Sequence, residues 1–188
     1  MRTLRLSLVG MLTVVLLGGL GGAVLAQDEE ALASDEPHPV SGTCAFAGDS
    51  GAESYGEGDG RWWRHGYPIR QSCEMDDARL SGNLRMLWNH ESIGGPIYRG
   101  DGEVIAGTVQ LVNDDGSWVG TVRGHVAYEE FGRHHYWQFE LTGTGPYEGY
   151  SALAYAEGAG GGGPKMVEGF VFPGALPEYP DPVEVPAE

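Results

Sequence analysis

Two histidines and two glutamates stand at the ends of strands that the sequence predicts: His90, Glu103, Glu130 and His135. Each lies two residues from an apolar strand residue, as Glu130 does from Tyr128 and His135 from Trp137. Because side chains two apart in a strand share a face, we expect all four to point inward. Such groups over an apolar cavity could act as acid and base or bind a divalent metal ion. The alternative is that polar residues at strand ends simply meet water.

The apolar neighbours of these groups suggest what the site would hold. Trp88, Tyr128 and Trp137 precede or follow the polar residues on the same faces. We therefore predict a barrel that binds a small apolar or aromatic ligand at its mouth, with histidine and glutamate orienting a polar group. A second hypothesis is an enzyme on the same scaffold that uses the same residues as acid and base. A third is a non-catalytic cell-envelope interaction protein with a filled barrel.

The elements that must position these residues are strands. From Arg79 to Phe172, apolar and polar residues alternate with a period of two, and Gly, Asp or Pro interrupts the pattern at turns. The predicted strands are Ser41–Ala47, Tyr67–Met75, Arg79–His90, Glu103–Val112, Ser117–Glu130, His134–Thr142, Tyr147–Ala156 and Met166–Phe172. Eight sequential antiparallel strands usually close on themselves, so the predicted fold is all-β, an eight-stranded antiparallel up-and-down β-barrel with disordered acidic termini.

The connections between these strands differ in length. If the strands alternate in direction, the short turns, including Asn113 to Gly116, gather at one end. The opposite end collects the long connections Gly48 to Gly66, Glu91 to Gly102 and Glu157 to Lys165. Long loops at one rim usually carry the binding surface of a scaffold. We call this end the mouth.

The two cysteines indicate the cellular compartment of the protein, and the net charge limits the kinds of partner that it could bind. Cys44 and Cys73 are the only cysteines, and in an oxidising compartment they most simply form a disulfide; a catalytic thiol is the alternative. Without residues 1–26 the chain carries nine basic and 27 acidic side chains, a formal charge of −18. That field repels phosphate backbones, so nucleic acid is not an expected partner.

The ends of the chain indicate secretion. Residues 1–26 have a basic start, a nearly uncharged apolar run and small residues at Val24-Leu25-Ala26, which is typical of a signal peptide; an uncleaved membrane anchor is the alternative. We predict a signal peptide over 1–26, an acidic linker over 27–40, the β-barrel domain over 41–172 and a Pro-rich acidic tail over 173–188. The mature protein would be secreted, with no membrane contact. The tail could also be held on the barrel through Leu176 and Tyr179.

The remaining motifs do not predict a cofactor or a metal. The run Gly158 to Gly163 lacks the helix and the Lys-Ser/Thr pair of a phosphate loop. The acidic loop around Asp49 to Asp59 fails the calcium-hand spacing at Gly51 and Ser54. Trp62, Trp63, His65 and Tyr67 could stack on a sugar or an aromatic ligand, or could cap the barrel.

One turn carries a resemblance to known barrels. The segment Gly143-Thr144-Gly145-Pro146-Tyr147-Glu148-Gly149 resembles the Gly-x-Gly-x-aromatic-x-Gly turn of allene oxide cyclase and dirigent barrels and of related small secreted bacterial proteins. Its glycines permit a tight turn, and Tyr147 is expected to pack across Gly149. The resemblance covers Ser117 to Phe172 and implies an eight-stranded barrel. Those plant enzymes hold apolar or phenolic substrates and steer ring closure or radical coupling by shape, but none of their catalytic positions is matched here.

Overall fold

The computed structural model describes residues 36–49, 54–58, 61–97, 99–129, 132–160 and 162–181. The predicted signal segment, most of the acidic linker, the end of the tail and Glu130 lie outside these described residues. The strands are β1 (His38–Asp49), β2 (Ser54–Gly58), β3 (Arg61–Met75), β4 (Gly82–Ile93), β5 (Gly102–Val112), β6 (Ser117–Glu129), β7 (Gly132–Thr144), β8 (Tyr150–Ala159) and β9 (Lys165–Pro173). Two short 3₁₀ turns, η1 (Ala78–Leu80) and η2 (Gly145–Tyr147), precede β4 and β8.

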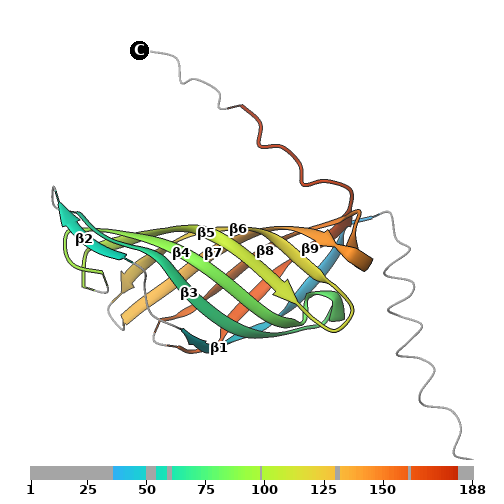
Figure 1. The fold of residues 1–188 in the computed structure, drawn as a ribbon, viewed down its shortest axis with the longest axis horizontal. Helices are drawn as coiled ribbons and strands as arrows, with labels where there is room; N and C mark the ends of the chain where they lie inside the picture. Colours follow the sequence, from blue (N-terminus) through green and yellow to red (C-terminus); the bar gives the residue numbers. More distant parts are fainter. Residues whose placement is uncertain are drawn as a thin grey trace, which may run out of the picture.

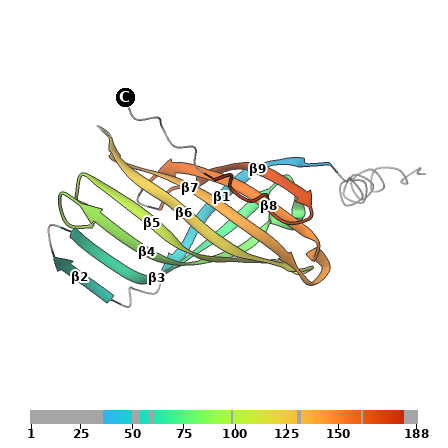
Figure 2. The same cartoon turned by 90° about the horizontal axis from the view of Figure 1, so that it is seen from above.

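The sheet closes on itself. Each strand from β3 to β9 pairs antiparallel with the next, and β1 pairs with both β9 and β3, which makes a ring of eight strands (Figures 1 and 2). The strand β2 pairs with the first part of β3, Arg61 to His65, on the edge that β1 occupies farther along β3. The predicted all-β barrel is therefore confirmed, with one added strand. Closure leaves no unpaired edge along the ring, which removes the edge where another chain could pair.

Three sequence predictions about elements are wrong. The segment Gly48 to Gly66 is not one long loop, because β2 and the first part of β3 form a hairpin within it. Its many glycines and acids hid the period-two pattern. The predicted strand Tyr147–Ala156 began too early, since β8 begins at Tyr150 because Gly145–Tyr147 forms η2. The predicted strand Arg79–His90 likewise began too early, since Ala78–Leu80 forms η1 and β4 begins at Gly82.

The inner face follows the predicted alternation. The buried core consists mainly of inward residues of all the ring strands, among them Val40, Ile69, Met86, Val109, Val122, Leu141, Ala154 and Val171. Gly124 lies opposite Trp137 on β7, and a Cβ there would meet Tyr136 O at 2.1 Å and the Trp137 ring at 2.9 Å. The missing side chain thus makes room for the indole inside a narrow barrel.

The end opposite the mouth is plugged. Trp118 is fully buried and donates from Nε1 to Arg79 O at 2.8 Å, which ties β6 to η1. Asn113 accepts from the backbone N–H of Gly116 at 2.9 Å and donates from Nδ2 to Arg79 O and Ser81 O. The predicted tight turn at Asn113 to Gly116 therefore also holds η1 in place across this end of the barrel.

Tyr147 packs differently from the expectation. No atom lies within 4 Å of a Cβ built on Gly149, so the predicted contact with that residue is wrong. The Tyr147 ring instead stacks on Trp118, with 5.4 Å between ring centroids, and a Cβ on Gly116 would approach it to 2.9 Å. The motif therefore seals the plugged end of the barrel.

The predicted disulfide joins Cys44 to Cys73 across the β1–β3 seam, where the two residues are direct register partners. In the chain-entropy relation, a link closing a loop of this size stabilises the folded state by about 3 to 4 kcal/mol. We expect the double variant C44A/C73A to lose about that much free energy of unfolding in urea. The reduced wild-type protein should lose a similar amount. A loss below about 1 kcal/mol in both would contradict a stabilising role for the seam link.

Candidate functional site

A cavity of about 310 Å³ opens at the mouth of the barrel. Its apolar walls come from Phe46, Tyr67, Ile69, Trp88 and Trp137, which lie on strands β1, β3, β4 and β7. Polar side chains of the lining are Asp49, Gln71, His90, Arg133, His135 and Lys165. The cavity is at the small end of the roughly 300 to 1,000 Å³ of ligand pockets, so it suits a ligand of about one ring.

Aromatic rings make a continuous wall across the interior. The Trp88 and Trp137 rings meet edge to face, with 4.8 Å between centroids. Their register places His90 beside Trp88 at 5.2 Å and His135 beside Trp137 at 5.2 Å. Because β4 and β7 are not neighbours in the sheet, these contacts cross the lumen and depend on closure of the barrel.

A histidine and a glutamate meet at the end of this wall that faces the mouth. His90 Nδ1 lies 3.5 Å from Glu103 Oε2, and both side chains are buried. The Tyr128 hydroxyl donates to Glu103 Oε1, which orients the carboxylate. The parity argument therefore brought His90, Glu103 and Tyr128 together correctly.

An arginine joins the interior through a bulge in β3. The β3–β4 register shifts between Arg64 and Tyr67, and Gly66 adopts a φ of 70° that favours glycine. Asn89 Oδ1 accepts from the Gly66 N–H at 3.1 Å and holds the bulge. As a result both Arg64 and Tyr67 are buried, and the guanidinium carbon lies 3.1 Å from the Tyr67 ring centroid. The Tyr67 hydroxyl donates to Asp49.

The single lysine of the chain, Lys165, is buried in the same cavity. Its side chain is on the inward face at the start of β9 and the residue is only 3% exposed, although lysines are almost never buried this fully. The ammonium donates to Gly158 O at 3.3 Å and to Ala159 O. It lies 5.7 Å from the centre of the Trp137 ring.

Burial and the nearby cations lower the pKa values of the basic groups at the mouth. Burial, with the nearby guanidinium groups of Arg64 and Arg133, lowers the pKa of His90 to about 4. Burial, Lys165 and Arg133 lower the pKa of His135 to about 3. Burial and Arg133 likewise lower the pKa of Lys165. Both imidazoles are therefore neutral at pH 7, so the 3.5 Å contact of His90 with Glu103 is not a pair of opposite charges.

Several buried polar atoms around the cavity have no hydrogen-bond partner among the described residues. They are Trp88 Nε1, Trp137 Nε1, Gln71 Oε1 and both ring nitrogens of His135. Buried polar atoms in folded proteins nearly always have partners, so each such atom calls for an explanation. A cavity whose lining has unused donors and acceptors is suited to a polar ligand group.

The structure brings together six of the seven residues predicted for the ligand site. Trp88, His90, Glu103, Tyr128, His135 and Trp137 all lie on the inner side at the mouth. The seventh, Glu130, is outside the described residues. His134, Arg123, His125 and Glu140 lie on the outer face as predicted, where Arg123 and Glu140 approach to 3.7 Å.

Sequence reasoning missed Arg64 and Lys165. Counting back from Tyr67 by two gives His65 and Trp63, so the bulge at Gly66 concealed the inward position of Arg64. Lys165 was assigned to the loop before β9. Counting back by two from Val167 would have placed it on the inner face.

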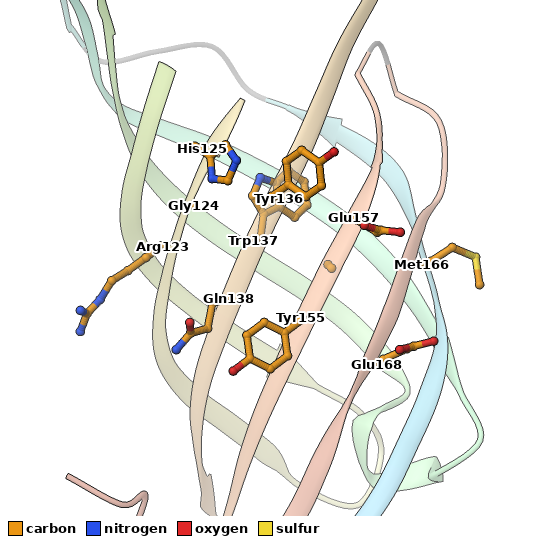
Figure 3. A pocket seen from close by; sticks show the side chains of 11 residues that line it. Arg123, Gly124, His125, Tyr136, Trp137, Gln138, Tyr155, Glu157, Met166 and Glu168 are labelled. Atoms are coloured by element: carbon orange, nitrogen blue, oxygen red, sulfur yellow. The ribbon is translucent and has the colours of Figure 1, made fainter. Parts of the chain in front are cut away.

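A second hollow, of about 480 Å³, lies on the outer face of strands β6 to β9 (Figure 3). The side chains of Tyr136 and Tyr155 line it. The His125 ring stacks on the Tyr136 ring, with 4.9 Å between the two ring centroids. Beyond its edge, Tyr179 of the tail donates to Glu140 at 2.8 Å, so this part of the tail contacts the barrel. The hollow is open to solvent along the sheet.

Comparison with known proteins does not assign the chain to a family. No family model, curated protein or solved structure matches the chain. Within the described ranges, no three His, Cys, Asp or Glu side chains are grouped so that they could hold a metal ion. The described part of the chain also contains no helix long and apolar enough to cross a membrane.

The two buried histidines predict a loss of stability in mild acid. Their folded pKa values lie below the ordinary 6.5, so the unfolded chain binds protons more tightly. The contribution of the two neutral histidines to the free energy of unfolding is therefore fully present above about pH 6.5, and it is lost as the pH falls toward 4. We expect each histidine to account for about 1 to 2 kcal/mol of the decrease in unfolding free energy between pH 7 and 5.

Urea unfolding at the two pH values tests this expectation. The variant H90Q/H135Q should have a clearly smaller decrease than wild type, because glutamine does not titrate. His125→Gln, on the exposed outer face, is the matched control and should keep the wild-type decrease. An unchanged decrease in the double variant would show that the histidines do not titrate as described.

Proposed function

We propose that this protein is a secreted binding barrel that holds a small, largely aromatic or apolar molecule in the cavity at its mouth. The observation that carries the proposal is the 310 Å³ cavity itself, which has aromatic walls and buried polar groups without described partners. A few polar groups in an apolar pocket are the usual composition of a ligand site. A filled barrel of a purely interacting protein would not need this space.

Secretion is part of the same proposal. The apolar segment at residues 1–26 and the Cys44–Cys73 disulfide are both consistent with export to an oxidising compartment. The strong negative charge of the chain keeps it soluble and repels nucleic acid, so it favours a carrier of a small molecule over a nucleic-acid-binding protein. Likeness to allene oxide cyclase and dirigent barrels remains a proposal that rests on the Gly143 to Gly149 turn.

The rim of the cavity offers a test that leaves the core intact. Phe46 lines the cavity and is 42% exposed, so Phe46→Ala should cost little stability. We expect it to weaken binding of a single-ring aromatic probe such as trans-cinnamate about three- to tenfold, because apolar contact is lost. Quenching of tryptophan fluorescence measures binding, since Trp88 and Trp137 line the cavity.

Phe170→Ala is the matched control, since Phe170 is 48% exposed on the outer side of β9 and does not line the cavity. It should leave the dissociation constant unchanged. Equal weakening by both variants would place the probe elsewhere. Native mass spectrometry of protein purified from its producing cells would then identify any molecule that co-purifies.

A second candidate function is a cyclase or isomerase on the same scaffold. The buried His90, 3.5 Å from a Glu103 that Tyr128 orients, favours it, because a neutral imidazole beside a carboxylate can move a proton. In this case Glu103→Gln should abolish conversion of a co-purified ligand while the ligand still binds. If Glu103→Gln leaves both binding and the ligand unchanged, the protein is a carrier.

A further inference from the structure

We propose that the ligand of the mouth cavity carries a single oxyanion group, most simply a carboxylate, which Lys165 and the indole N–H groups of Trp88 and Trp137 hold. This inference rests on the proposed function, since it names the chemical class of the ligand in the same cavity. The observation that carries it is the burial of the single lysine in the cavity lining, which also contains two tryptophans whose indole N–H groups have no described partner.

The inventory of hydrogen-bonding groups favours an acceptor on the ligand. An indole N–H can only donate, and both Trp88 Nε1 and Trp137 Nε1 are buried without a described partner. An ammonium has three N–H groups, and Lys165 uses two on Gly158 O and Ala159 O. One N–H of Lys165 is therefore left for another acceptor beside the Trp137 ring.

The charge distribution favours an anion. The chain has one lysine and a formal charge of −16, yet that lysine is buried in the lining of the cavity, where Arg133 is a second cation and Asp49 is the anion. Burying an ammonium group costs free energy unless an opposite charge or hydrogen bonds to all its N–H groups compensate, and the carbonyl groups of Gly158 and Ala159 use two of the three N–H groups of Lys165. Burial is the main cause of the lowered pKa of His135, and the neighbouring charges of Lys165 and Arg133 add to it.

The cavity also limits the size of the anion. At about 310 Å³ with aromatic walls, it has room for one ring and one small charged group. The rings of Trp88 and Trp137 provide surfaces for the apolar body, and Lys165 lies 5.7 Å from the Trp137 ring. Both ends of an aromatic carboxylate would thus be accommodated by neighbouring side chains.

The test compares trans-cinnamate with its neutral analogue trans-cinnamamide, which has nearly the same shape. Titration calorimetry on the full chain at pH 7 should show cinnamate binding about ten- to hundredfold more tightly, the worth of a charge-assisted hydrogen bond. Lys165→Met removes the charge but keeps most of the hydrocarbon stem, and it should reduce the preference to below about threefold. Lys165→Arg should keep at least part of the preference. Tyr155→Ala, on the outer face, is the control that should leave it unchanged.

A direct readout is available because Lys165 is the only lysine. Its ¹⁵Nζ resonance can be followed by NMR in the unmodified protein, and cinnamate should raise the pKa of this ammonium while cinnamamide should not. This measurement does not depend on the folding of a variant.

The outcomes separate the two proposals. Equal binding of the acid and the amide would overturn the oxyanion inference but leave the binding function standing. A preference for the acid that persists in Lys165→Met would assign the anion to other groups and also overturn the inference. No binding of either probe at millimolar concentration would overturn the proposed function and this inference with it.

Discussion

The closure of the sheet between β1 and β3 is the constraint on which the rest of the structure depends. Strands β4 and β7 are separated by two others in the sheet, yet Trp88 and Trp137 touch across the interior because the ring is closed. The seam between β1 and β3 is held by their antiparallel strand pairing and by the disulfide between Cys44 and Cys73. Without it the inward side chains of β3, β4, β7 and β9 would line one open face, and no enclosed cavity would form.

The two ends of the closed barrel have different chemistry. At one end Trp118, Tyr147 and Asn113 close over η1, and their polar atoms bond to one another or to the backbone. At the other end the inward positions of the same strands hold histidines, arginines and the single lysine. A plugged end supplies rigidity, and a rigid scaffold allows the mouth to hold buried polar groups, some of which have no partner among the described residues.

The sequence predicted the fold and most of the site because both depend on a period of two. That period placed Trp88, His90, Glu103, Tyr128, His135 and Trp137 on the inner face, and the structure agrees. It failed where one residue shifts the period, since the bulge at Gly66 turns Arg64 inward. It also failed where glycines mask a strand, as in β2 and before Lys165. The cations Arg64 and Lys165 could not be placed inside the barrel from the sequence, because these irregular segments supply them.

The most direct test of this account is a nuclear Overhauser spectrum of the oxidised protein in solution. The closed barrel predicts cross-peaks between the indole protons of Trp88 and Trp137, which belong to non-adjacent strands. It also predicts contacts between the α protons of Gly42 and Met75, which are partners across the seam two residues beyond the disulfide. Absence of both sets, with rapid exchange of the β1 and β3 amide protons, would contradict closure and with it the enclosed site.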